Sequence, residues 1–93
     1  MKEVLLSAKG PVGVYLVPDR VKCKLKEYCI KYVKDYLKIK TYQKELRFNE
    51  TDFIKYLNNI FPNEKSIFIK TLGHIWIKPE LPDKYRDYEW YDF

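Results

Sequence analysis

The side chains that most often perform catalysis or bind metals are scarce in this chain. His74 is its one histidine, and Cys23 and Cys29 are its two cysteines. A zinc site needs closely spaced pairs of such ligands, and these three residues lack that spacing. On a helix the two cysteines would point to different faces, so we expect reduced thiols rather than a disulfide. The sequence therefore predicts no metal site and no cofactor.

Motifs for nucleophilic catalysis and for phosphate binding are also missing from the sequence. Ser7 and Ser66 do not lie in a GxSxG motif, and Gly10 and Gly13 form neither a GxGxxG motif nor a P-loop. We therefore expect a protein that is not an enzyme. An enzymatic alternative would need a cleft that joins His74 to carboxylates.

Charge is distributed unevenly along the 93 residues of the chain. Positions 1–47 hold 12 basic and 5 acidic side chains, positions 48–93 hold 6 basic and 8 acidic ones, and the net charge is +5. A molecule with one basic part can attract an anionic partner. Solvation of a small lysine-rich protein explains the same excess, and both interpretations stay open.

One long helix is predicted from about Asp19 to Ile39 or Lys40, because Pro18 and Asp19 suit a helix start. Apolar and aromatic side chains recur at helical spacing along one face, which we expect to pack on the core. These residues are Val21, Leu25, Cys29, Val33, Tyr28, Tyr32 and Tyr36. Tyrosines can stack on nucleic-acid bases only if they face outward, and this stripe predicts that they face inward.

Four lysines on the opposite face of this helix form the first predicted partner-binding surface. They are Lys24, Lys31, Lys34 and Lys38. Glu27 lies among them and lowers the local charge, and a solvated helix face would show the same pattern. On the flank, Cys23, Ile30 and Leu37 form either a wider core contact or the start of a partner groove.

The rest of the chain predicts short strands and one shorter helix. Glu3–Ala8 and Val12–Val17 are rich in apolar and β-branched residues and predict two strands that form a hairpin; the alternative for the first segment is a frayed terminus. Tyr42–Phe48 alternates roughly and predicts a further strand. Asn49 is predicted to cap a second helix, which Pro62 closes.

A second hairpin is predicted near the Gly73-His74 pair, which Ser66–Leu72 and Ile75–Lys78 flank. The alternative is a short helix that ends at Gly73. The expected fold is α+β, with a small antiparallel sheet packed against one long and one shorter helix. We expect residues 1–93 to form one domain.

The segment 81–93 is aromatic and acidic, and it forms the second predicted partner-binding surface. Aromatic side chains are frequent anchors of protein interfaces. The predicted anchors are Tyr85, Tyr88, Trp90, Tyr91 and Phe93. In the alternative interpretation the segment wraps its own domain and completes a small core, and only its outer edge is left for a partner.

Four stretches of the sequence carry a resemblance to a known group of proteins. VYLVP lies at 14–18, EYC at 27–29 and FNETDFIKYLN at 48–58, and the segment from Leu81-Pro82 closes on YDF. This pattern resembles small uncharacterised proteins of Firmicutes and their mobile elements, and NE-x-DFI-x-YLN is its most specific part. The resemblance spans most of the chain and implies a bacterial or phage accessory protein. It assigns no catalytic residue.

Together these features predict a non-enzymatic accessory protein that binds a larger macromolecule. More specifically, we expect an inhibitor of a defence nuclease or an immunity-type protein, with a protein or nucleoprotein partner. The alternative is a small nucleic-acid-binding domain that uses the lysine face of the first helix, with salt-dependent affinity.

Neither a membrane span nor a leader is expected from the sequence. No apolar run approaches the roughly 18 residues needed to cross a bilayer. The apolar stretch within Met1–Gly10 is too short for the core of a signal peptide, so the expected compartment is the cytoplasm.

Overall fold

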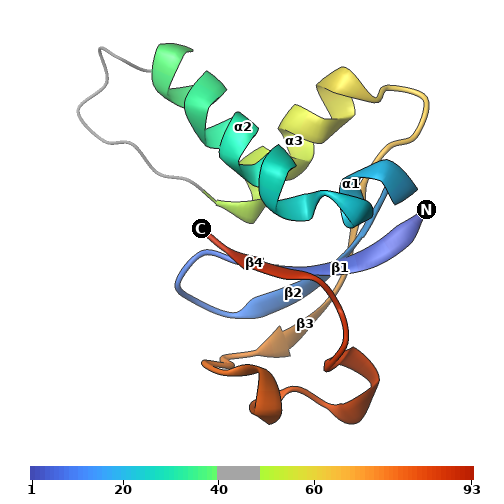
Figure 1. Ribbon diagram of the computed structural model, residues 1–93, viewed down its shortest axis with the longest axis vertical. Coiled ribbons are helices and arrows are strands. Elements are labelled where there is room, and N and C mark those ends of the chain that lie inside the picture. Colours follow the sequence, from blue (N-terminus) through green and yellow to red (C-terminus); the bar gives the residue numbers. More distant parts are fainter. Residues whose placement is uncertain (40–48) are drawn as a thin grey trace.

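The computed structural model describes the backbone of residues 1–39 and 49–93 and the side chains of residues 1–35 and 49–93. In these parts of the chain, three helices lie on one side of a sheet (Figure 1). The elements in chain order are β1 (Lys2–Ser7), β2 (Val12–Val17), α1 (Asp19–Cys23), α2 (Leu25–Ile39), α3 (Glu50–Ile60), β3 (Ile67–Gly73), the short 3-10 helices η1 (Lys78–Glu80) and η2 (Asp83–Tyr85), and β4 (Trp90–Asp92). The α+β class predicted from the sequence is confirmed. The strand predicted at Tyr42–Phe48 lies outside the described residues.

The four described strands form one sheet in the order β3-β2-β1-β4. β1 and β2 are the predicted hairpin, with Val4 opposite Tyr15. β3 pairs antiparallel with β2, whereas β4 runs parallel to β1, with Trp90 beside Leu5. The sheet is therefore mixed, which corrects the prediction of a wholly antiparallel sheet. The chain crosses one face of the sheet between β3 and β4, so that it enters β4 in the direction of β1.

Both faces of the sheet are covered, and each carries its own apolar core (Figure 1). Side chains of a strand alternate between faces, so β1 sends Val4 and Leu6 to one core and Leu5 to the other. The helix-side core contains Val4, Leu6, Tyr15, Val17, Val21, Leu25, Cys29, Tyr32, Phe53 and Leu57. The tail-side core contains Leu5, Val12, Val14, Leu81 and Tyr85.

The predicted long helix is interrupted at Lys24, which corrects the expectation of one continuous helix. Lys24 has φ −132° and ψ 40°, so α1 ends there and α2 starts at the next residue at an angle to it (Figure 1). α1 packs against β1, whereas α2 packs against α3 and β4. Val21 of α1 and Leu25 of α2 are both buried, so the apolar face predicted from helical spacing is kept on both sides of the break.

Helix α3 forms as the sequence predicts. The side chain of Asn49 accepts a hydrogen bond from the backbone N–H of Asp52 at 2.8 Å, which satisfies a donor of the first turn. Phe53 and Leu57 of this helix are buried in the helix-side core. The helix ends at Ile60, two residues before Pro62.

The second predicted hairpin is wrong in its second strand. β3 forms as expected, but the chain leaves the sheet at Gly73, whose φ of +100° suits glycine, and Ile75–Lys78 is not a strand. Ile75 packs instead against the tail-side core. Ile75 gains from partial burial on the sheet face, and in this position its segment cannot pair with β3 as the local sequence predicted.

Candidate interaction surfaces

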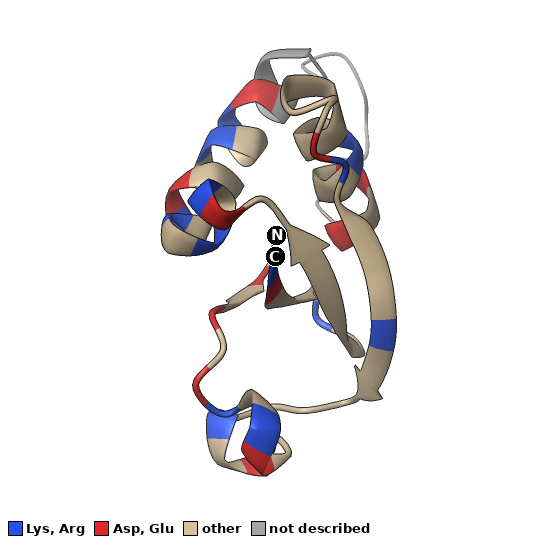
Figure 2. Cartoon of the chain, turned by 90° about the vertical axis from the view of Figure 1, so that its right-hand side faces the viewer, with Lys and Arg blue, Asp and Glu red and all other residues tan. Residues whose placement is uncertain are grey.

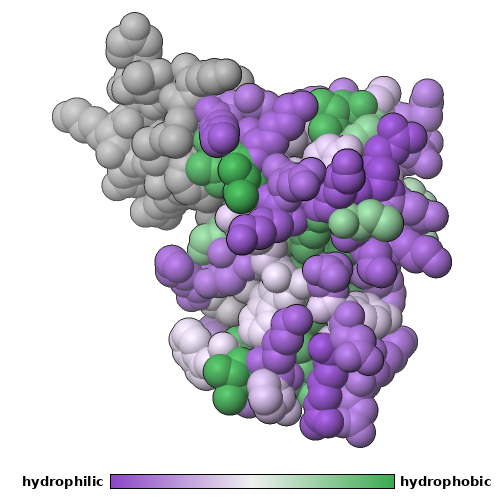
Figure 3. Space-filling model, viewed as in Figure 1, coloured by the Kyte–Doolittle hydropathy of each residue, from purple (hydrophilic) through white to green (hydrophobic). Residues whose placement is uncertain are grey.

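The lysine face of the first helical region is exposed as predicted. Lys24, Lys31 and Lys34 are all exposed, and the side chain of Lys38 lies outside the described residues. Hydrophilic residues cover most of the face that α1 and α2 present, with smaller apolar areas between them (Figure 3). Acidic residues are interspersed with the basic ones along these helices (Figure 2), so this face is only moderately basic.

The tyrosines of α2 face the core, which confirms the prediction for Tyr28 and Tyr32. Tyr32 is 3% exposed, and its ring contacts the ring of Phe53 edge to face at 5.6 Å. Tyr28 makes a similar contact with Phe61 at 5.9 Å. The side chain of Tyr36 lies outside the described residues. Base stacking is therefore closed to the two described tyrosines of this helix.

Two of the three flanking residues are more exposed than a wider core contact would allow, and the side chain of the third, Leu37, lies outside the described residues. Cys23 and Ile30 are exposed, whereas Cys29 is buried, and neither cysteine forms a disulfide. Burial raises the pKa of the Cys29 thiol well above its usual range. Cys29 therefore behaves as a small apolar core residue, while Cys23 is open to reagents.

The first half of the aromatic segment packs on the tail-side core. Tyr85 is only 4% exposed and meets Tyr88 edge to face at 4.9 Å. The hydroxyl of Tyr88 donates to a carboxylate oxygen of Glu3 at 2.9 Å, and this hydrogen bond raises the pKa of Tyr88. Tyr85 is thus closed to a partner in the folded state, and Tyr88 serves the fold as well.

The second half of the segment forms β4 and packs on both cores, with Trp90 against the tail-side core. The indole N–H of Trp90 donates to Ser7 at 3.0 Å. Tyr91 and Phe93 pack against the helix-side core, where the ring of Phe93 lies 5.4 Å from that of Phe53. All five predicted anchors are thus integrated in their own domain. Their role in partner binding stays a prediction for the parts of Tyr88, Trp90, Tyr91 and Phe93 that remain accessible.

Asp92 links β4 to the end of β1 and to the turn that follows it through several polar contacts. It accepts hydrogen bonds from the hydroxyl of Ser7 and from the backbone N–H of Lys9, both at 2.8 Å. Burial alone would raise the pKa of Asp92, but these hydrogen bonds and the Lys9 ammonium outweigh it and hold the pKa below the usual value. Lys9 lies in the β1–β2 turn with a φ of +57°, in the left-handed region. The hydrogen bond from its backbone N–H to Asp92 helps to hold it in that conformation.

Strand β3 exposes apolar side chains that the sequence analysis did not single out. Ile67, Phe68 and Ile69 are 50%, 53% and 41% exposed. The predicted second hairpin would have covered the outer edge of this strand, and its absence leaves that edge without a neighbouring strand among the described residues. The signal in the sequence was the run of three large apolar residues, which exceeds the alternation of a strand with one solvated face.

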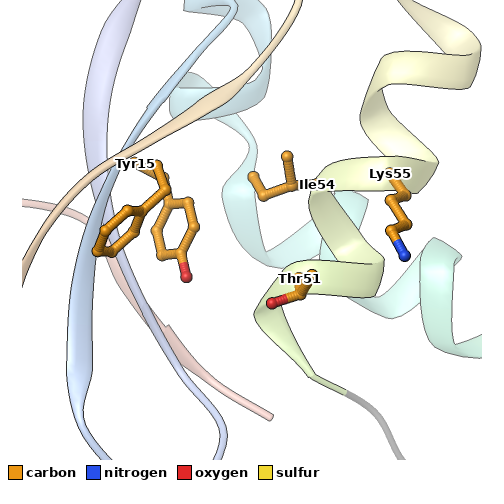
Figure 4. A pocket seen from close by; sticks show the side chains of 5 residues that line it. Tyr15, Thr51, Ile54 and Lys55 are labelled. Atoms are coloured by element: carbon orange, nitrogen blue, oxygen red, sulfur yellow. The ribbon is translucent and has the colours of Figure 1, made fainter.

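A groove lies beside β3, between this strand and α3 (Figure 4). Its volume is about 340 Å³, and its lining residues are Tyr15, Thr51, Ile54, Lys55 and Phe68. Ile54 points from α3 toward Tyr15 on the sheet (Figure 4), and the Tyr15 ring meets that of Phe68 edge to face at 5.4 Å.

Tyr15 forms the sheet side of the groove because Gly13 leaves room for its ring. A Cβ at position 13 would lie 2.8 Å from the ring of Tyr15, which is closer than such contacts occur. Burial, together with the nearby carboxylate of Glu50, raises the pKa of Tyr15 to about 12. The groove is mainly apolar because Tyr15, Ile54 and Phe68 make up most of its lining.

Candidate metal ligands do not gather into a metal site in the described parts of the chain. His74 is exposed, and in ranges 1–39 and 49–93 no group of three or more histidine, cysteine or acidic side chains is arranged to hold a metal ion. No helix in those ranges has the length and apolar character needed to cross a membrane.

Comparison with known proteins does not place the chain in a family. No protein-family model, no curated protein and no solved structure matches the chain. The resemblance to small Firmicutes proteins stays a prediction. Inference about function therefore depends on the surfaces described above.

Proposed function

We propose that this protein is a non-enzymatic binding domain that docks on a larger protein. The supporting observation is that five large apolar side chains between positions 67 and 77 are exposed, three of them consecutive on β3. Besides the three residues of β3, Trp76 is 74% exposed and Ile77 is 57% exposed. Single exposed apolar residues are common, but three consecutive ones on an edge strand are unusual, and exposed tryptophan is a frequent interface anchor.

A narrower form of this proposal is an accessory protein of a bacterium or phage that inhibits a defence nuclease or acts as an immunity protein. Small size, absence of catalytic motifs from the sequence and the resemblance described above support it. Such a protein acts by covering a surface of its target, which requires an exposed binding face and no chemistry of its own.

Affinity capture from a nuclease-treated lysate of a bacterial host tests the proposed function. We expect the protein to retain a specific protein partner, and we expect the double variant Phe68→Ser, Trp76→Ser to lose it. Both side chains are more than half exposed, so the variant should fold. Ile30→Ser is the matched control, because Ile30 is exposed on α2. Equal retention by the double variant, or no protein retained, would contradict the proposal.

Binding of nucleic acid is the second candidate, and the exposure of Lys24, Lys31 and Lys34 favours it. Contacts between these lysines and phosphates would release counterions, so affinity would fall steeply with salt. Changing all three lysines to glutamate should then abolish retention of DNA or RNA. A flat salt response would reject this candidate.

A further inference from the structure

We propose that the outer edge of β3 binds an extended segment of the partner as an additional strand, and that this segment alternates apolar and acidic residues. The inference rests on the proposed function, since it specifies how the partner is held. It combines three features of this surface: an open strand edge, an apolar groove on one side of it and a lysine on the other.

The first feature is the open edge. β3 pairs only with β2 among the described residues, from Leu16 opposite Ile67 to Val12 opposite Gly73. An edge strand presents backbone N–H and C=O groups to solvent, and an extended peptide can satisfy them. Figure 2 shows β3 along one side of the molecule, with α1 and α2 on the opposite side.

Register shifts in the β2–β3 pair limit how long an added strand can be. The shifts lie between Val12 and Gly13 and between Val14 and Tyr15 of β2, and each places one extra residue in β3. Such bulges bend a strand and interrupt regular pairing. We therefore expect a short added segment, which suits a reversible contact more than an extended intermolecular sheet.

The second feature explains the apolar residues of the partner segment. Phe68 lies on the helix side of β3, where its ring meets Tyr15 and lines the groove with Ile54. Side chains of an added strand alternate between the two faces of the sheet. Those on the helix side would reach this groove, where apolar side chains gain most from burial.

The third feature explains the acidic residues. Lys70 is the one charged residue of β3, and its ammonium lies 5.3 Å from the centre of the Tyr85 ring, on the tail side of the sheet. Side chains of an added strand that face this side would meet Lys70. Lys55, which lines the groove, adds a second positive charge. The carboxylate of Glu50 lies near Tyr15, but neither β3 nor the groove lining itself contains an acid.

Charge also distinguishes this partner from a second copy of the chain. Pairing of two β3 strands would bring Lys70 of both copies into one ribbon with no acidic residue of either strand to balance them. Lysine on an edge strand is a common device against such self-pairing. An acidic segment, by contrast, is complementary to the edge and gains from charge attraction.

Amide NMR spectra of the intact protein test the inference with a synthetic peptide that alternates valine and glutamate. We expect shifts confined to β3 and the groove residues. A peptide with lysine in place of glutamate, and a peptide with N-methylated backbone on one edge, should bind at least about tenfold more weakly. The first control removes the charge match and the second removes the strand pairing.

Two matched protein variants separate this edge from the lysine face. Lys70→Glu should weaken binding of the valine–glutamate peptide about tenfold, whereas Lys34→Glu, the same charge change on α2, should alter it less than about twofold. Both lysines are exposed, so both variants should keep the spectrum of a folded protein.

Several results would overturn the inference: no binding of the valine–glutamate peptide, shifts centred on α2, equal binding of the lysine peptide, or a stable dimer in sedimentation experiments. Failure of the proposed function is distinguishable from these. If the captured partner depends on Phe68 and Trp76 but the peptide does not compete with it, the binding domain stands and the added strand is wrong. If capture is independent of both side chains, the proposed function fails as well.

Discussion

The two edge strands of the sheet, β4 and β3, differ in how they are covered. β4 is three residues long, and Asp92 within it accepts hydrogen bonds from Ser7 and Lys9 while the adjacent Phe93 packs in the helix-side core. β3 is seven residues long and exposes three consecutive large apolar side chains. The β4 edge is thus held by contacts within the protein, whereas the β3 edge leaves apolar side chains exposed. An aromatic residue at a sheet edge can complete a core, as Phe93 does, or stay exposed, as Phe68 does, and the surrounding packing decides which.

The largest expected effect is that of Phe93→Ala at the β4 edge. The Phe93 ring lies 5.7 Å from Tyr32, 5.4 Å from Phe53 and 4.9 Å from Tyr91, so its removal leaves a cavity among aromatic rings. We expect a loss of about 2–4 kcal/mol in the free energy of unfolding. Urea unfolding followed by fluorescence measures it. A loss below that of the equivalent change at Phe68 would reverse the comparison of the two edges.

A smaller loss is expected from Asn58→Ala, which releases the start of β3 from α3. The side chain of Asn58 accepts from the backbone N–H of Ser66 at 2.6 Å and donates to its carbonyl at 3.3 Å. Loss of both bonds should cost about 1–3 kcal/mol and speed hydrogen exchange in β3. Asn59→Ala is the control, because Asn59 is exposed in the same helix. Unchanged exchange in β3 would show that the strand is held by its pairing with β2 alone.

Asp92→Asn tests how much the polar contacts of Asp92 stabilise the fold and how this contribution depends on pH. The pKa of Asp92 in the folded protein lies below its usual value, so the carboxylate stabilises the fold above that value. This contribution is lost as pH falls through the folded pKa. We expect the variant to be about 1 kcal/mol less stable at neutral pH and equal to the parent protein in strong acid. Denaturant unfolding over a pH series measures the difference, and Asp87→Asn at an exposed position is the control. A difference that does not change with pH would contradict this account.

The smallest stability effect is expected for Phe68→Ala at the β3 edge. Phe68 is 53% exposed and its main ring contact is with Tyr15. The free energy of unfolding should fall by less than about 1 kcal/mol. Binding of the valine–glutamate peptide should nevertheless weaken clearly, because the groove loses one wall. A large stability loss with unchanged peptide binding would show that β3 is structural like β4.

Local sequence rules predicted the elements whose pattern depends on near neighbours. The hairpin of β1 and β2 follows from two apolar runs around turn residues, and the cap at Asn49 follows from one side chain and one nearby N–H. The inward face of α2 follows from helical spacing, and it holds for Tyr28 and Tyr32. The candidate surface on the lysine face was found by the same spacing, and its lysines are exposed where the structure describes them.

Features that depend on distant contacts were missed. The break at Lys24 allows α1 and α2 to rest on different supports, and neither support is adjacent in sequence. The hairpin predicted after Gly73 is replaced by packing of Ile75 on the tail-side core. The open edge of β3 is a consequence of that replacement, so the candidate site at this edge was not predictable from local pattern.

The order of residues alone shows which side chains are apolar, predicts the β1–β2 hairpin and the cap at Asn49, and shows that charge is uneven along the chain. Only the tertiary structure decided that the aromatic C-terminal segment completes the cores and that β3 is left with an open edge. The physical reason is that propensity and capping act over a few residues, whereas burial depends on which surfaces meet. Tyr85 and Phe68 belong to the same class of side chain, and their different exposure, 4% and 53%, is a property of the assembled fold.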